Sequence, residues 1–349
     1  MTVHETTALK GPRGENIMYQ SMLRAFCLLA LLSFGVGAAA DEFDRIYIFG
    51  DSLSDTGNLA SLIGPLPPPY YRNRISNGPV AVDTLAAGVG LTADASLHLI
   101  GPAVGPNYAV AGARARGDEA IDLATQVTLF LANHGLQAPR DALYVIMIGG
   151  NDVRDARDAR TDPEARRIIR RAVRRIGVAL ATLAGAGARR FLVVNVPDIG
   201  VIPETRLLAA ATGDATLPAR ATHLSRRFNR HLHRTVSLLA HNPALRITEF
   251  DLFAFLGVLL ANAGQYGFTN TTDPCFSSET FTFYPGCENG AKFGEYVFFD
   301  EIHPTTRVHA FIGMAMGEAL EEEPQSRELA HRLGALLSKA LRRARRHSP

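Results

Sequence analysis

Short apolar runs alternate with amphipathic segments along most of the chain. Runs rich in β-branched and aromatic residues, typical of buried strands, cover residues 46–49, 142–149, 191–196 and 246–251. Between them, apolar residues recur at helical spacing over residues 79–90, 118–134, 162–187 and 218–240. Strands separated by helices in this rhythm predict right-handed crossovers. We therefore expect an α/β fold, a three-layer α/β/α sandwich with a central, mostly parallel sheet.

The helix expected from residue 162 has the most clearly marked start. Asp162 is placed to cap it, Pro163 fits its first turn, and Glu164 complements the helix dipole. Gly185 and Gly187 end it. Its arginines recur at helical spacing, at Arg166, Arg167, Arg170, Arg171, Arg174 and Arg175. A solvated outer face explains this row better than a binding site does.

The first strand ends in a group of polar residues. Its apolar run stops at Gly50, and Asp51 and Ser52 follow at once. In open α/β sheets, ligands bind outside the carboxyl ends of the strands, so Ser52 is a candidate nucleophile. A simpler interpretation is a turn followed by a helix cap. The choice depends on the partners that Ser52 finds elsewhere in the chain.

Suitable partners stand near the other end of the chain, in the segment FFDEIHPT. Asp300 and His303 are three positions apart, close to one helical turn, so their side chains can face the same way. A serine hydroxyl becomes a good nucleophile when an imidazole accepts its proton, and a carboxylate holds that imidazole in the correct tautomer. Ser52, Asp300 and His303 are therefore the candidate catalytic residues.

Four short blocks of sequence contain these residues and two others. They are FGDSLSDTGN with Ser52, NYAVAGA with Gly112, IGGND with Asn151, and DEIH with Asp300 and His303. In this order they resemble the GDSL family of serine esterases and lipases, also called SGNH hydrolases, over roughly residues 44–320. The resemblance implies an oxyanion hole formed by the amides of Ser52 and Gly112 and the side chain of Asn151. Many members have two glycines in the second block, whereas this chain has Ala111 before Gly112.

The resemblance also implies an SGNH or flavodoxin-like sandwich and a serine hydrolase that cleaves carboxylic esters through an acyl-enzyme. Lipid or short acyl esters are the expected substrates. Two other activities fit the same site: acyl transfer to an acceptor other than water, and deacetylation of a polysaccharide. A different class is a non-catalytic, membrane-binding, haemolysin-like protein, and the intact set of five catalytic positions argues against it.

Composition and charge exclude other classes. The 349 residues are 47% hydrophobic, enough for one large core, and the net charge of +2 is too small to argue for nucleic acid as a partner. His231, His233 and His241 form no metal-binding pattern, and His309 is expected to face away from His303. No phosphate-binding loop occurs in the sequence, so we expect neither a metal nor a nucleotide cofactor.

The N-terminal part has the pattern of a secretory signal. Residues 22–40 contain an arginine, an apolar run and small residues that end at Ala40, which predicts cleavage before Asp41. The residues before this segment are unlike a signal peptide, so we expect translation to begin at Met18 or Met22. The sequence therefore predicts a secreted or periplasmic protein.

Two cysteines, Cys275 and Cys287, remain after that segment is removed. In an oxidising compartment an even number of cysteines favours pairing, and this bridge would close a loop of about 13 residues, a constraint of roughly 3 kcal/mol. We predict a disulfide that braces the segment before Asp300.

Three regions divide the chain. Residues 1–40 are the expected N-terminal extension and signal peptide, 41–323 the hydrolase domain, and 324–349 a basic amphipathic helix or tail. Two interpretations of the tail are open: contact with a membrane surface, or docking on the domain. Residues 61–80 are expected to form an irregular loop near the active site, which either lines an acyl pocket or lies on the surface. It contains Asn77 and Gly78, which match a recurrent Ser-Asn-Gly-Pro segment of the family.

Overall fold

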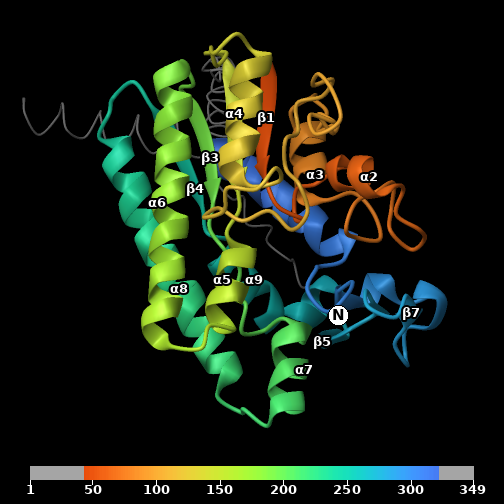
Figure 1. Ribbon diagram of the computed structural model, residues 1–349. Helices are drawn as coiled ribbons and strands as arrows, with labels where there is room; N and C mark the ends of the chain where they lie inside the picture. The colour runs from red at the N-terminus through yellow and green to blue at the C-terminus, as the bar shows by residue number, and fades with distance from the viewer. Residues whose placement is uncertain (1–42, 322–349) are drawn as a thin grey trace, which may run out of the picture. The chain divides into compact units, whose positions relative to one another are not determined.

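A computed structural model describes residues 43–321 of the chain (Figure 1). Four parallel strands form the central sheet in sequence order: β1 (Arg45–Gly50), β2 (Ala142–Met147), β3 (Arg190–Val194) and β4 (Arg246–Phe250). Every residue of β2 is buried, as expected for a parallel strand with helices on both faces.

A further segment extends the sheet beside β1. Residues 107–110 run parallel to β1, and Tyr108 N donates to Ile48 O at 2.7 Å while Val110 N donates to Gly50 O at 3.2 Å. Counted as the second strand in the chain, this segment gives the order 2-1-3-4-5 of flavodoxin-like sheets. The strand order therefore reverses at β1, and ligands of such folds bind at this reversal.

Two layers of helices cover the sheet. The helices α4 (Leu123–Asn133), α6 (Asp162–Ala186) and α8 (Leu217–Ala240) form a row on one face (Figure 1). The helix α3 (Ala81–Gly88) and a helix over residues 306–321 lie on the other face, where Val308, Ile312 and Met316 join the core. The predicted three-layer α/β/α sandwich is confirmed.

The long predicted elements are present, with small differences at their ends. The N-cap of α6 is Thr161 and not Asp162, because the Thr161 hydroxyl accepts the hydrogen bond from Glu164 N at 3.4 Å. Four short helices had no clear periodicity in the sequence and were not predicted: α2 (Asn58–Ile63), α5 (Gly150–Arg157), α7 (Pro203–Thr212) and α9 (Leu252–Ala261). They surround the carboxyl edge of the sheet.

A small irregular unit precedes the last helix. It contains the strands β5 (Asn270–Pro274), β6 (Phe276–Ser277), β7 (Thr282–Phe283) and β8 (Tyr296–Phe298). Cys275 and Cys287 form the predicted disulfide, with their Cα atoms 5.2 Å apart. Phe276 N donates to Phe299 O at 2.9 Å, so the disulfide-bonded segment lies beside the residues that lead into Asp300.

The predicted signal peptide and the predicted basic tail at 324–349 lie outside the described residues. Among residues 43–321, every helix is too short or too polar to span a bilayer.

Candidate active site

Ser52 lies where β1 ends, at the reversal of strand order. The last residue of β1, Gly50, is held by the buried side chain of Gln126 through both its N–H and its C=O. Gly50 N donates to Gln126 Oε1 at 3.0 Å, and Gln126 Nε2 donates to Gly50 O at 2.8 Å. The chain then turns sharply, because Ser54 N and Asp55 N both donate to Asp51 O at 3.0 Å. This turn presents Ser52 at the carboxyl edge of the sheet.

Asp300 and His303 meet in a turn and not in a helix. Asp300 Oδ1 accepts hydrogen bonds from Ile302 N at 2.8 Å and from His303 N at 2.7 Å, which folds the backbone tightly around the carboxylate. His303 Nδ1 lies 2.8 Å from Asp300 Oδ2. The two side chains are adjacent as the spacing predicted, but the reason is a turn closed by the Asp300 side chain itself.

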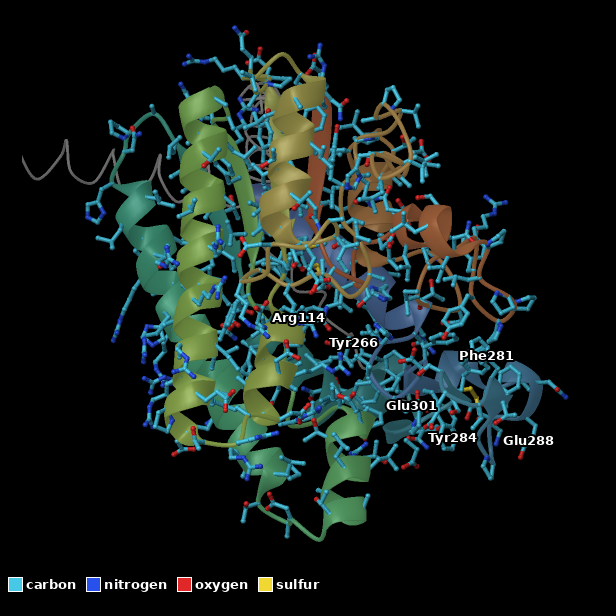
Figure 2. The ribbon with its side chains drawn as sticks, in the orientation of Figure 1. Arg114, Tyr266, Phe281, Tyr284, Glu288 and Glu301 are labelled. Carbon is cyan, nitrogen blue, oxygen red and sulfur yellow. A yellow bond between two sulfur atoms is a disulfide. The ribbon has the colours of Figure 1, made fainter. Side chains whose placement is uncertain are left out.

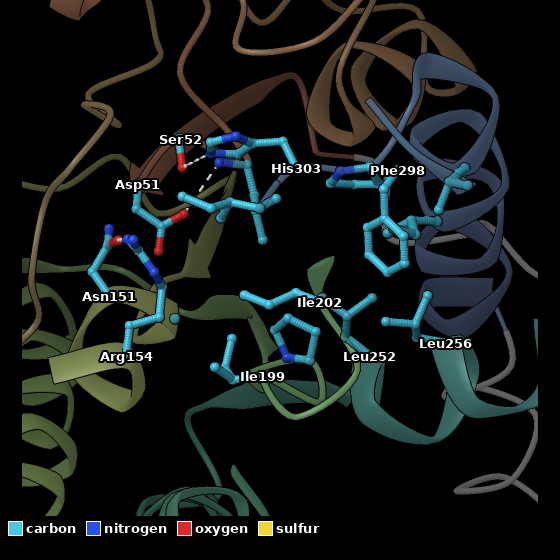
Figure 3. Close-up of a pocket in the computed structure, with 17 residues that line it drawn as sticks. Asp51, Ser52, Asn151, Arg154, Ile199, Ile202, Leu252, Leu256, Phe298 and His303 are labelled. Atoms are coloured by element: carbon cyan, nitrogen blue, oxygen red, sulfur yellow. Dashed lines mark hydrogen bonds between the residues drawn. The ribbon is translucent and has the colours of Figure 1, made fainter. Parts of the chain in front are cut away.

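The three side chains form one connected line, of which Figure 3 draws the contact between Ser52 and His303. His303 Nε2 lies 2.8 Å from Ser52 Oγ, although the two residues are 251 positions apart in the chain. Since Asp300 faces Nδ1, the proton of the neutral imidazole is held on that nitrogen, and Nε2 is free to accept the serine proton. Asp300 is fully buried, which protects this arrangement from solvent.

Gly112 lies in a loop that two buried aspartates hold. Its φ of +86° is a conformation that favours glycine. On one side Asp55 Oδ2 accepts from Ala111 N at 2.8 Å, and on the other Asp152 Oδ2 accepts from Ala115 N at 2.7 Å. Burial raises the pKa of both carboxyl groups. The backbone amide of residue 111 therefore ties the loop to the turn that contains Ser52, as a glycine amide at this position would.

Asn151 lies in the first turn of α5, beside Ser52 in the same pocket. Its Nδ2 donates one hydrogen to Ala113 O at 3.0 Å, in the loop of Gly112. Arg154 Nη1 donates to Asn151 Oδ1 at 3.0 Å, which fixes the orientation of the amide (Figure 3). Arg154 is itself paired with Glu204 of α7. The second Nδ2 hydrogen remains available for a ligand.

An apolar pocket opens beside these groups, with a cavity volume of about 50 Å³. Around Ser52, Asn151, Arg154 and His303 it is lined by Leu53, Pro197, Ile199, Ile202, Leu252, Leu256, Phe298, Ile302, Val308 and Ile312. All of these lining residues come from parts of the chain other than the loop 61–80.

The loop holds the segment after His303. Ser76 Oγ donates to Pro304 O at 3.0 Å, and Thr306 N donates to Asn77 Oδ1 at 2.9 Å. A Cβ atom at Gly78 would come within 2.4 Å of the Thr306 hydroxyl, so the close approach requires glycine. The Ser-Asn-Gly segment thus positions the backbone on which His303 stands.

His309 adds a buried hydrogen bond between the helix that follows His303 and the start of α3. It is fully buried, and its Nδ1 accepts a hydrogen bond from Ala81 N, at the start of α3, at 3.2 Å. Burial lowers the pKa of His309 to about 3, with a smaller effect from nearby His303. A neutral ring is needed here, because a protonated Nδ1 could not accept from the amide.

Asp51 is a buried acid that the sequence did not single out for a role. Its side chain lines the pocket next to Ser52 and accepts a hydrogen bond from Leu53 N at 3.1 Å. Burial raises the pKa of Asp51 to about 6, and the nearby imidazole of His303 acts in the opposite direction.

The sequence identified Ser52, Asp300 and His303, which the structure brings together. It did not identify the residues whose hydrogen bonds fix the surrounding backbone and side chains. Asp55, Asp152, Arg154, Gln126 and Thr306 each bind a backbone or side chain of the site, but an isolated polar residue has no pattern that reveals its partner. A signal was present for Arg154, which lies three positions after Asn151 and so on the same side of a helix. Within residues 43–321, no group of three His, Cys, Asp or Glu side chains is arranged to bind a metal ion.

Comparison with known proteins gives a consistent result. A family model described as GDSL-like Lipase/Acylhydrolase matches residues 46–316. The chain is 28% identical to a phosphatidylcholine-sterol acyltransferase from Aeromonas hydrophila, over 85% of this chain and 96% of that protein. It is 26% identical to a GDSL esterase/lipase from Arabidopsis thaliana, over 84% of this chain and 96% of that protein. It is 27% identical to a thermolabile hemolysin from Vibrio parahaemolyticus, over 80% and 64%.

Proposed function

The chain belongs to the GDSL-like lipase/acylhydrolase family, and from this premise we propose that it is an exported serine hydrolase that cleaves lipid or other acyl esters. The observation that carries the proposal is the 2.8 Å contact between Ser52 Oγ and His303 Nε2, with Asp300 on the other ring nitrogen. Hydrogen bonding in this order activates a serine for attack on a carbonyl carbon.

In the proposed mechanism, Ser52 Oγ attacks the ester carbonyl and His303 Nε2 takes its proton. The negative charge on the carbonyl oxygen is stabilised by the amides of Ser52 and Gly112 and by the Asn151 side chain. When the tetrahedral intermediate collapses, the C–O bond to the alcohol breaks and His303 gives its proton to the leaving oxygen. Water then attacks the acyl-enzyme with the same base, which releases the acid and restores Ser52.

The apolar pocket supports an acyl chain as the group transferred to Ser52. Hydrocarbon side chains line it beyond the reacting atoms, and burial of each further methylene contributes about 0.8 kcal/mol to binding. Lipid substrates also agree with the names of the relatives, a lipase, an acyltransferase of phosphatidylcholine and a hemolysin.

Export is supported by the disulfide between Cys275 and Cys287, because such bonds persist in oxidising compartments. The signal pattern before Asp41 supports it independently. N-terminal sequencing of the mature protein should find a start at or near Asp41.

Acyl transfer to an alcohol is a second candidate activity. It is favoured by the similarity to a phosphatidylcholine-sterol acyltransferase along 96% of that protein's length. The acyl-enzyme is common to both reactions, so the product formed when an alcohol such as a sterol is present distinguishes them.

The test compares two serines of the same turn, on a panel of p-nitrophenyl esters, phospholipids and acetylated sugars. Ser52→Ala should lower kcat by about four orders of magnitude or more, because the nucleophile is lost. Ser54→Ala is the matched control: Ser54 is buried two positions away, and its hydroxyl has no hydrogen-bond partner among the described residues. Equal losses in the two variants, or hydrolysis that survives in Ser52→Ala, would refute the proposal.

A further inference from the structure

Two neighbouring helices carry a large share of the positive charge of the protein. The outer helix α6 contains six arginines, and α8, packed beside it, contains five arginines and three histidines. Acidic residues in these two helices are confined to Asp162 and Glu164 in the first turn of α6. Figure 2 shows nitrogen-rich side chains gathered along both helices. The arginine row of α6, which alone suggests a solvated face, thus has a second row next to it.

Most of these charges are not neutralised by acids. In the part of the chain that the structure describes, carboxylates pair with Arg166, Arg171, Arg175 and Arg220. No carboxylate of residues 43–321 lies within ion-pairing distance of Arg167, Arg170, Arg174, Arg227, Arg230 or Arg234. We call the side of α6 and α8 formed by these six residues the basic face.

Four of the six arginines of the basic face act on His231. Burial lowers the pKa of His231, and the positive charges of four arginines from both helices lower it further: Arg227, Arg234, Arg230 and Arg170. The guanidinium groups therefore lie close enough together to act on one imidazole. Such a concentration of like charge favours an anionic partner.

A hollow of about 450 Å³ lies at one end of the basic face. Its basic walls are Arg160, Arg166, Arg220, His223 and Arg227, and Asp162, which pairs with Arg166, is the one acid in the lining. The Nε atom of Arg227 is buried without a hydrogen-bond partner among the described residues. The hollow lies where α6 and α8 begin. Helices that follow parallel strands begin at the carboxyl edge of the sheet, which is also the edge that holds Ser52.

Exposed apolar residues continue the two arginine rows. Val178 follows Arg174 by four positions in α6 and is 48% exposed, and Leu238 follows Arg234 by four positions in α8 and is 74% exposed. A spacing of four places each pair on the same side of its helix. A face that combines arginines with exposed apolar residues suits a lipid interface, where charges meet head groups and apolar groups enter between them. A nucleic acid offers no comparable partner for Val178 and Leu238.

We infer that the basic face docks the enzyme on anionic phospholipid surfaces, with lipid phosphates bound by its arginines. Guanidinium groups bind phosphate oxygens through paired hydrogen bonds, and unpaired arginines are free to do so. The inference rests on the proposed function in one respect, that the substrate is a lipid ester in such a surface.

The experiment measures sedimentation with vesicles, in a Ser52→Ala background so that the lipid is not consumed. The protein should bind vesicles that contain phosphatidylglycerol more tightly than vesicles of phosphatidylcholine alone, and high salt should release it. Arg170→Gln with Arg230→Gln should weaken binding about 25-fold, since each arginine near an anionic surface contributes about fivefold.

The control removes equal charge elsewhere, with Arg45→Gln and Arg140→Gln, two exposed arginines outside α6 and α8. This pair should change binding by less than about threefold, since its charges lie away from the surface that docks. The inference would be overturned if both double variants lost vesicle binding equally, or if the protein bound neutral vesicles as tightly as anionic ones. Tighter binding to a DNA duplex than to anionic vesicles would also overturn it. With Ser52 intact, both pairs should hydrolyse a soluble p-nitrophenyl ester at the wild-type rate. Absence of that activity would count against the proposed function and leave the vesicle result interpretable.

Discussion

At the scale of single residues, Asn77 holds the backbone that follows His303, the proposed base. Asn77→Ala removes the acceptor of Thr306 N, so the loop that carries the imidazole loses one of its fixed points. A hydrogen bond of this kind contributes about 1 kcal/mol, and small displacements of a base are costly to the chemical step. We therefore expect kcat for a soluble ester to fall about tenfold with KM nearly unchanged.

Asn242→Ala is the matched control for this prediction. Asn242 Oδ1 also accepts a backbone amide in a loop, from Ala244 N at 3.0 Å, but it is exposed and follows α8. The kcat of the Asn242→Ala variant should stay at the wild-type level. If both variants lose activity equally, the loss reflects general destabilisation and not the position of His303.

His309 gives the protein a specific dependence of stability on pH. Its pKa is about 3 in the folded protein, compared with 6.5 for an unperturbed imidazole. Between these values the unfolded chain binds a proton that the folded chain does not, so the stabilisation is complete above pH 6.5 and is lost as the pH falls toward 3. From pH 7 to pH 5 this one group should lower the free energy of unfolding by about 2 kcal/mol.

Urea unfolding of the wild type and of His309→Asn, at pH 7 and at pH 5, measures the contribution of His309 to the free energy of unfolding. The amide introduced by this substitution is neutral and still able to accept from Ala81 N, so the variant should lose about 2 kcal/mol less between pH 7 and pH 5. Burial also lowers the pKa of His98, to about 4, but that contribution is common to both proteins and cancels. An unchanged pH dependence in the variant would show that His309 is not the group responsible.

The candidate catalytic residues were predictable because their chemistry is tied to short local patterns. Ser52 follows a strand, and Asp300 and His303 stand three apart. The residues that hold them could not be predicted in this way. Asp55 and Asp152 bind backbone amides that are far away in the sequence, and no local pattern identifies such partners. The buried positions of both, 1% and 0% exposed, became clear from the structure.

At the scale of elements, α5 depends on the turn at Gly149, which starts the helix that carries Asn151. Gly149 has a φ of +125°, and a Cβ atom there would lie 2.4 Å from the ring of Phe228. Gly149→Ala should therefore lower the free energy of unfolding by roughly 1–3 kcal/mol and shift Asn151, with a loss of kcat. Denaturation and ester hydrolysis measure the two effects.

Gly185→Ala tests the opposite case in α6. Gly185 is helical, and apart from the backbone of its own helix and its two chain neighbours no atom of the described residues lies within 4 Å of the position that a Cβ would take. The free energy of unfolding should rise by up to about 1 kcal/mol, with activity unchanged. Destabilisation of similar size in both variants would show that the space around Gly149 is not the cause.

Elements with strong periodicity were predicted well, and short ones were not. The helix predicted from residue 162 is α6, because the proline of its first turn, its dipole charges and its apolar spacing all agree over its 25 residues. By contrast, α5 has eight residues, too few for a periodic pattern, and its apolar content is low. The spacing of Asp300 and His303 suggested a helical turn, but hydrogen bonds from the backbone to Asp300 form a different turn with the same result.

At the scale of the whole molecule, the sequence predicted the layers but not the order of the strands. The segment over residues 107–110 has no strand-like run, yet it forms the edge beside β1 and brings Val110 to Gly50, the last residue of that strand. Its place is fixed by hydrogen bonds to β1. The basic face likewise becomes visible when α6 and α8 are seen side by side, since each helix alone resembles an ordinary solvated surface.

The contact between the loop at residues 76–81 and the helix that begins at residue 306 joins the two ends of the domain, 228 positions apart. A growing chain therefore carries the proposed nucleophile, Ser52, for most of its synthesis without the proposed base, His303. Fragments that stop before Asp300 should be unable to cleave esters, however well their sheet has formed.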